Sequence, residues 1–310
     1  MNLTRAETSS SLSPDHVKKE LRMMLIASIF TMNLFVFLVA ENQRAAISHW
    51  LLLVCAGAVV AVSVVIMYRQ KFKGLYGRTY GAIAIGLLLW FSAQVVDAYE
   101  QYSVTGTLIV EKGPMASGAA GLQPSIADAI WFAGYGFFAY FLFRIMIHYS
   151  KSIKPHTLVM IAAATAISAL VLTQSIAYYY NLYGPSSVIG TGTRSGAGIS
   201  EETISLFLKI EYPILDLILI VPALVILSGV KDGRLTSTPW LLLSAAVLIL
   251  AVGDIGNIYF SVLEIAQNHW IWKMFATAGY LCIATSLFWY NRFFIFDSKR
   301  STRIWQESNR

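Results

Sequence analysis

Two pairs of polar side chains stand out within the long apolar runs of this chain. Asp254 and Asn257 interrupt the run LILAVGDIGNIYF, and Gln94 and Asp97 interrupt WFSAQVVDAY in the same way. Each pair is spaced three residues apart, which places both side chains on one face of a helix. Carboxylate and amide groups bind cations or small polar ligands, and a carboxylate also exchanges protons. Ionisable groups inside a bilayer are costly, which makes them candidate functional sites.

Two further ionisable residues fall in comparable positions. Asp216 comes early in EYPILDLILIVPAL, and Lys273 lies near the start of the last apolar run. Asp128 begins another run, but Ser125 three residues before it forms a capping-box pattern, which favours a structural role for this acid. The predicted ligand-binding set is therefore Asp254, Asn257, Gln94, Asp97, Asp216 and Lys273.

The elements that must position these side chains are membrane-spanning helices. The chain has 310 residues, of which 56% are hydrophobic and 13% charged, with a mean hydropathy of +0.61. A helix crosses the hydrocarbon layer with about 20 apolar residues, and such runs occur near 22–41, 46–68, 79–100, 126–148, 157–180, 208–230, 240–262 and 270–294. We predict an all-α polytopic membrane bundle of eight transmembrane helices spanning 22–296, with an N-terminal segment 1–21 and a C-terminal tail 297–310.

The basic residues predict the orientation of these spans. With both termini cytoplasmic, most of the 23 Lys and Arg residues fall on the inner side, as the positive-inside rule requires. This distribution accounts for the net charge of +6 without a nucleic-acid partner. At 1.5 Å per residue, the six candidate residues then lie in the outer half of the membrane.

Two interpretations of the intramembrane acids follow from this placement. They line a polar cavity open to the outside, or they act as hydrogen-bonding contacts between helices. Burial disfavours a bare carboxylate, so in a cavity we expect Asp254 to respond to protons or to a bound cation. Its expected partners come from the other half of the chain, with Gln94 and Asp97 first and Asp216 or Lys273 as further neighbours.

A short internal repeat relates the two halves of the chain. The segment AGYGFFAYFLF, residues 133–143, matches AGYLCIATSLF, residues 278–288, at six of eleven positions. The span before each segment carries one of the two polar pairs. We therefore predict a duplication of four spans plus four, related by an axis along the membrane normal because each unit has an even number of spans.

No catalytic or cofactor motif is present in the sequence. The five histidines lie outside the middle of the predicted spans, which argues against bis-histidine haem binding. Cys55 and Cys282 fall within spans and predict neither a disulfide nor a metal cluster. We expect no enzymatic activity, no cofactor and no metal centre.

The segments PSIADAIWFAGY and EYPILDLILI, together with the Gly253–Asp254 step, resemble the multi-span membrane modules found ahead of prokaryotic diguanylate cyclases, phosphodiesterases and histidine kinases. The resemblance covers the chain from about Trp90 to Tyr290. It implies a sensory or membrane-anchoring input region of a prokaryotic cell membrane. The matching polar residues are Asp97, Asp128, Asp216 and Asp254. Only a short tail follows the last span here, so we expect signalling through another chain.

Three functions are therefore open. The first is a membrane sensor or regulatory module that binds a small ligand or ion from the outer side and signals to a partner protein. The second is a transporter or a proton- or ion-coupled permease, and the third is a structural subunit of a membrane complex. Few polar residues continue into the inner half of the spans, which favours a one-sided pocket or a structural role. Besides the lipid bilayer, a homo-oligomeric partner stays open.

Overall fold

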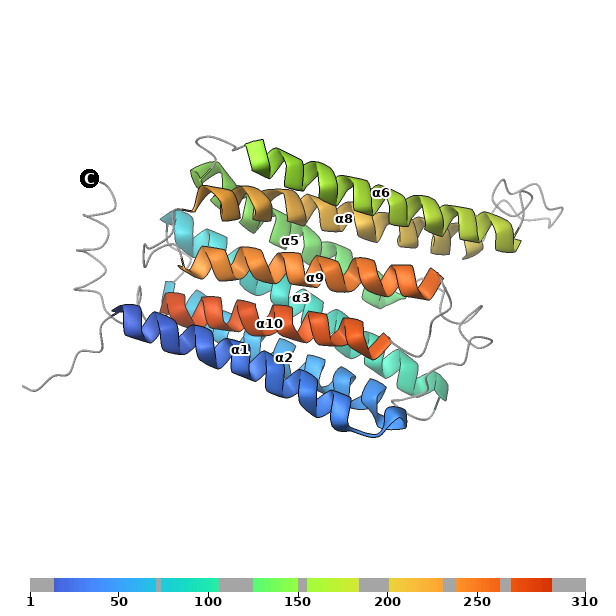
Figure 1. The fold of residues 1–310 in the computed structure, drawn as a ribbon, viewed down its shortest axis with the longest axis horizontal. Helices are drawn as coiled ribbons and strands as arrows, with labels where there is room; N and C mark the ends of the chain where they lie inside the picture. The colour runs from blue at the N-terminus through green and yellow to red at the C-terminus, as the bar shows by residue number, and fades with distance from the viewer. Residues whose placement is uncertain are drawn as a thin grey trace, which may run out of the picture.

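The computed structural model describes residues 14–70, 74–105, 125–149, 155–183, 201–230, 238–262 and 269–291. These residues form eight helices and no strand, which confirms the predicted all-helical fold (Figure 1). All eight helices are long and apolar enough to cross a membrane. In chain order they are α1 (Pro14–Leu38), α2 (Glu41–Gln70), α3 (Gly74–Thr105), α5 (Ile126–Tyr149), α6 (Pro155–Tyr183), α8 (Glu201–Gly229), α9 (Thr238–Val262) and α10 (His269–Tyr290).

The helix boundaries follow local sequence signals. Proline is the first residue of α1 and the second of α9, where its missing N–H group removes no intrahelical hydrogen bond. At the start of α5, the backbone N–H of Ser125 donates a hydrogen bond of 2.9 Å to Oδ2 of Asp128. This contact confirms the predicted capping interaction, in which the acid accepts from the residue just before the helix.

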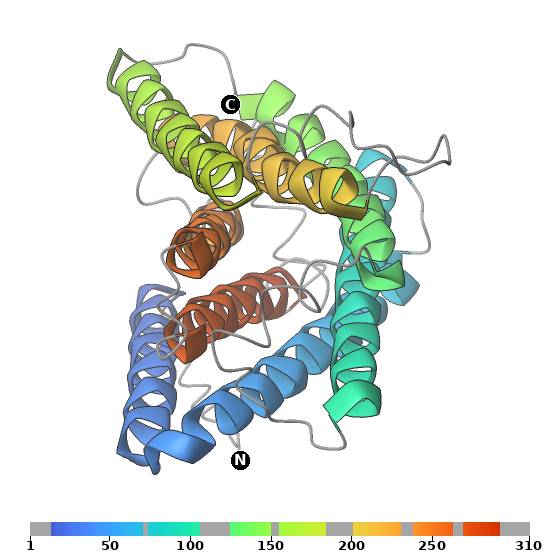
Figure 2. The same cartoon turned by 90° about the vertical axis from the view of Figure 1, so that its right-hand side faces the viewer.

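Successive helices run antiparallel along the length of the bundle (Figure 1). Six of them form a closed ring in which each helix packs against the next, in the order α2, α3, α5, α8, α9, α10 and back to α2. The other two lie outside this ring: α1 packs on α10 and α2, and α6 packs on α8 and α9. The view along the bundle shows α1 and α6 at its periphery (Figure 2).

The distribution of apolar side chains fits a lipid environment. Side chains inside the ring, such as Leu87, Phe138 and Ile283, are fully buried. By contrast, α1 leaves Ile26 67% and Phe30 66% exposed. Such large apolar surfaces would be unfavourable in water but are ordinary against lipid tails. The eight helices are therefore those expected of a multi-pass membrane protein.

Four aromatic side chains fill the ring near the end where α3 and α9 begin. The Tyr80 and Tyr290 rings stack with centroids 4.1 Å apart, and Tyr80 also meets Phe141 and Trp240 at 6.0 Å. All four side chains are buried. This end of the bundle, which the charge pattern predicts to be the inner one, is therefore closed by aromatic packing.

Candidate functional site

A buried tyrosine joins two of the predicted acids. The hydroxyl of Tyr135 on α5 donates a hydrogen bond of 2.8 Å to Oδ1 of Asp216 on α8. The same hydroxyl lies 3.4 Å from Oδ2 of Asp254 on α9. Asp216 and Tyr135 are only 2% and 3% exposed, and Asp254 is partly buried. Three neighbouring helices of the ring thus bring their polar groups to one point.

The number of available hydrogens makes this carboxyl pair suited to holding a positive charge. A tyrosine hydroxyl has one hydrogen to donate, and the short contact assigns it to Asp216. The longer contact becomes a full hydrogen bond if Asp254 carries a proton and donates it to the tyrosine oxygen. Two bare carboxylates here would instead repel each other, because their buried surroundings screen the charges weakly. A proton on Asp254 would supply the missing hydrogen and remove the repulsion, whereas a small cation would remove the repulsion alone.

The two acids also face a very small cavity. Its volume is about 10 Å³, and it is lined by Trp90, Asp216, Leu219, Val247, Leu250, Ala251 and Asp254. One water molecule needs about 10–15 Å³ of such space, so the cavity is at the limit for a single small guest. Oδ2 of Asp216 is buried and has no hydrogen-bond partner. A buried acceptor without a partner costs about 1–3 kcal/mol, and a bound proton, ion or water would remove that cost.

A second polar pair lies across the ring. Nε2 of Gln94 on α3 donates a hydrogen bond of 2.9 Å to the hydroxyl of Tyr280 on α10. Both side chains are buried, and Oε1 of Gln94 has no hydrogen-bond partner. Asp254 lies within electrostatic range of Tyr280. Gln94 therefore contacts Tyr280 and does not line the cavity.

A third polar contact joins α8 to the start of α5. The hydroxyl of Tyr212 on α8 donates a hydrogen bond of 2.7 Å to Oδ1 of Asp128. The Tyr212 and Tyr135 rings meet edge to face at 6.4 Å. Asp128 therefore caps its own helix with one carboxylate oxygen and holds α8 with the other.

The remaining predicted residues lie outside the cavity. Asp97 is partly buried and lies within electrostatic range of Tyr212. Asn257 is exposed near the end of α9. Nζ of Lys273 lies 3.4 Å from Nδ1 of His49 on α2. Of the six predicted residues, the structure thus brings Asp216 and Asp254 together and leaves the other four outside the cavity.

The exposure of side chains on one face of α9 changes along the helix. Ala251 is buried, Asp254 is partly buried and Asn257 is exposed. Exposure therefore rises toward the end of the helix that the charge pattern predicts to be outer. At the opposite end, the four packed aromatic rings close the bundle.

The tyrosines and Trp90 were not predicted as site residues. Trp90 lines the cavity, its ring lies 5.1 Å from that of Tyr135, and its Nε1 donates to the carbonyl oxygen of Trp131 at 3.3 Å. A usable signal was present, because Tyr135 and Tyr280 occupy the same position of the repeated Ala-Gly-Tyr sequence. Burial of a tyrosine hydroxyl normally requires a polar partner.

Equivalent glycines in the two halves make equivalent contacts. A Cβ atom on Gly134 would collide with the indole of Trp90 and would lie 3.3 Å from the carbonyl oxygen of Gly86. A Cβ atom on Gly279 would lie 2.6 Å from Cγ of Leu250 and 3.3 Å from the carbonyl oxygen of Ala246. The register that aligns Gln94 with Asp254 also aligns Trp90 with Leu250 and Gly86 with Ala246. Helices α5 and α10 therefore approach α3 and α9 through matching residues.

The polar contacts cross between the halves in a matching way. Tyr280 of the second half bonds Gln94 of the first, while Tyr135 of the first half contacts Asp254 of the second. In the aligned register these are the same pair of positions. The two positions differ chemically: one holds the amide Gln94, and the other holds the acid Asp254 beside Asp216.

Metal binding has no separate site within the described ranges. No group of three or more His, Cys, Asp and Glu side chains that could hold a metal ion occurs there. Cys55 and Cys282 are buried free thiols on α2 and α10.

Comparison with protein-family models, with curated proteins and with solved structures gave no match for this chain.

Proposed function

We propose that this protein is a membrane sensory or regulatory module whose responsive element is the carboxyl pair Asp216 and Asp254 with Tyr135. Its ligand would be a proton or a small monovalent cation entering from the outer side. The observation that carries the proposal is the single tyrosine hydroxyl shared by two acids beside a cavity of about 10 Å³. A guest larger than one water molecule does not fit there.

The same contacts explain how binding would change the protein. The two acids lie on adjacent helices, α8 and α9, and Tyr135 adds α5. Removing the proton or cation restores repulsion between the carboxylates and favours a looser packing of these three helices. A ligand shifts a conformational equilibrium only through such a difference in interaction between the two states. A partner protein would read the change at the inner side of the bundle.

The scarcity of polar residues in the inner half of the spans favours a sensor over a transporter. A transporter must expose its site to each side in turn, which requires a second conformation in which the aromatic rings at the predicted inner end separate. Cation-driven accumulation of a solute by proteoliposomes would establish the transporter alternative. A purely structural role predicts that neither ligand is bound.

Proton exchange upon cation binding tests the proposal. In a weakly buffered solution of the purified protein, adding Na⁺ or Li⁺ should release protons if the cation replaces a proton at the pair. Hydrogen exchange at constant pH should change in α5, α8 and α9. Both effects should disappear in Asp254→Asn. A wild-type protein without proton release and without any change in hydrogen exchange would refute the cation response.

We also infer that the site arose by duplication of a four-helix unit. The support is that matching positions carry the sequence repeat, the glycine contacts and the crossed polar contacts. Under this inference, Gln94 with Tyr280 is the counterpart of Asp254 with Tyr135. The amide cannot titrate, so only one copy would have kept the response.

A further inference from the structure

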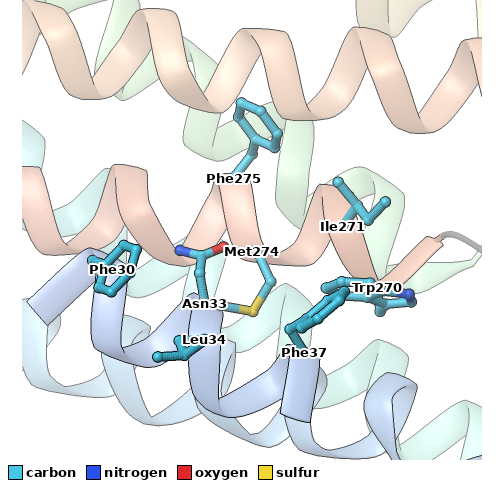
Figure 3. Close-up of a pocket in the computed structure, with 8 residues that line it drawn as sticks. All are labelled: Phe30, Asn33, Leu34, Phe37, Trp270, Ile271, Met274 and Phe275. Atoms are coloured by element: carbon cyan, nitrogen blue, oxygen red, sulfur yellow. The ribbon is translucent and has the colours of Figure 1, made fainter. Parts of the chain in front are cut away.

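An apolar groove separate from the carboxyl site runs between α1 and α10 (Figure 3). Its volume is about 360 Å³, and it is lined by Phe30, Asn33, Leu34, Phe37, Trp270, Ile271, Met274 and Phe275. From Phe30 to Phe37 it follows about two turns of α1, or about 10 Å. Seven of the eight lining side chains are apolar, and Nδ2 of Asn33 is bonded to the carbonyl oxygen of Ile29 at 2.7 Å.

The positively charged side chain of Arg44 lies at one end of this groove. The guanidinium carbon of Arg44 lies 5.3 Å from the ring centre of Phe37 and 5.6 Å from that of Trp270. Arg44 also donates hydrogen bonds to the carbonyl oxygens of Phe37 at 2.9 Å and of Val39 at 3.1 Å, which satisfies the end of α1. These two bonds use two of its five N–H groups. Within the described part of the chain, no carboxylate pairs with it.

The helix that forms one wall is held loosely by protein. Among the described side chains of α1, only Val36 is buried. This helix packs mainly on α10 and α2. A guest in the groove would therefore contribute much of the contact between α1 and the rest of the bundle.

We propose that this groove binds an anionic phospholipid. One acyl chain lies between Phe30, Leu34 and Met274, and the phosphate accepts hydrogen bonds from the free N–H groups of Arg44. The position of Arg44 at the ends of α1 and α2 places it at headgroup level, where Trp270 also belongs as an interfacial aromatic. Guanidinium is well matched to phosphate geometry. The acyl chain of the lipid fills the apolar groove, and its phosphate supplies the negatively charged partner that Arg44 lacks.

Native mass spectrometry of the detergent-purified protein tests this site. The probes are phosphatidylglycerol and phosphatidylcholine with identical acyl chains, together with free glycerol phosphate. We expect phosphatidylglycerol to bind at least several-fold more tightly than phosphatidylcholine, and glycerol phosphate to give no adduct. Arg44→Gln should abolish the preference, whereas Arg44→Lys should keep part of it. Leu34→Trp should weaken both lipids by filling the groove.

Arg69→Gln is the matched control. Arg69 lies at the other end of α2, and its Nη1 donates a hydrogen bond of 3.1 Å to Oδ1 of Asn291, so its loss should leave the lipid preference unchanged. Three results would overturn the proposal: equal binding of the two lipids by the wild-type protein, a preference that survives in Arg44→Gln, or a second polypeptide occupying the groove. The wild-type comparison decides even if a variant fails to fold.

Discussion

At the scale of single residues, Tyr135 determines what the two acids can do. It is buried among apolar and aromatic neighbours, it bonds Asp216, and it lies close to Asp254. Without the hydroxyl, both carboxyl groups would lose their shared partner. We therefore treat this tyrosine as the positioning residue of the site and Asp254 as its accessible acid.

Replacing Tyr135 by phenylalanine should destabilise the protein by about 1–3 kcal/mol, because the variant leaves buried acceptors without a donor. The measurement is the free energy of unfolding in detergent by chemical denaturation. Tyr140→Phe on the same helix is the matched control, since Tyr140 is 46% exposed, and it should change stability by no more than about 0.5 kcal/mol. Equal effects of the two substitutions would contradict the assigned role of Tyr135.

Two substitutions of Asp254 separate response from stability. Asp254→Asn keeps an oxygen near Tyr135 but cannot exchange a proton, so the folded variant should lose proton release and the change in hydrogen exchange. Asp254→Leu should in addition lose about 1 kcal/mol, the lower end of the usual cost, because the stronger bond from Tyr135 to Asp216 remains. An Asn variant that responds like the parent would show that Asp254 is only an interhelical contact.

At the scale of helices, two glycines set the spacing that lets the polar groups meet. Gly134→Ala and Gly279→Ala should each cost about 1–3 kcal/mol, because the added methyl group overlaps Trp90 or Leu250. Gly136 is the control, since a Cβ atom there meets nothing within 4 Å. Gly136→Ala should be neutral or stabilising by up to about 1 kcal/mol. Thermal unfolding of the three variants in one detergent provides the comparison.

The predictable part of the fold was the set of helices. Apolar runs and flanking signals specify each span, and the structure places all eight where the sequence indicated. The predicted end of the last span, near 294, lies outside the described residues. The clustering of Asp216 with Asp254 was less accessible to prediction, because it depends on which helices become neighbours in the ring. The apolar run correctly placed Gln94 and Asp97 on α3, but their three-residue spacing could not reveal that Gln94 is buried while Asp97 is only partly buried.

Tyr135 shows most clearly which part of the site could not be predicted from the sequence. In the sequence it is one of many aromatic residues in an apolar span, and aromatic residues in such spans are commonly interfacial or core. Its hydroxyl gains significance only when α8 and α9 bring two acids beside it. The repeated Ala-Gly-Tyr segment pointed to the position without indicating its chemistry.

At the scale of the whole molecule, the charge pattern predicts which way the bundle is inserted. A reporter fused after Arg310 and one inserted near Lys71 should both report the cytoplasm, and one within 191–197 should report the outside. This predicted orientation would place Asn257 on the outer side of Asp254. A cytoplasmic signal from the last reporter, with the other two also cytoplasmic, would overturn the eight-span topology.

Duplication makes a second prediction for the whole molecule. In an experimental structure, the pair α3 and α5 should superpose on α9 and α10 by rotation about an axis along the membrane normal, and the same rotation should carry α2 onto α8. The expected cause is the shared glycine and tyrosine contacts. If the rotation that aligns the first two pairs leaves α2 far from α8, the similarity is local to those pairs and the four-plus-four duplication is wrong.

The most direct test of the central claim is infrared difference spectroscopy of the lipid-embedded protein during titration with acid and with Na⁺ or Li⁺. The carboxyl C=O stretch reports whether an acid is protonated. We predict a carboxyl band that changes on titration and is lost or shifted in both Asp216→Asn and Asp254→Asn, but is retained in Asp97→Asn. A wild-type protein without such a band, or a band that survives in both variants of the pair, would contradict the account.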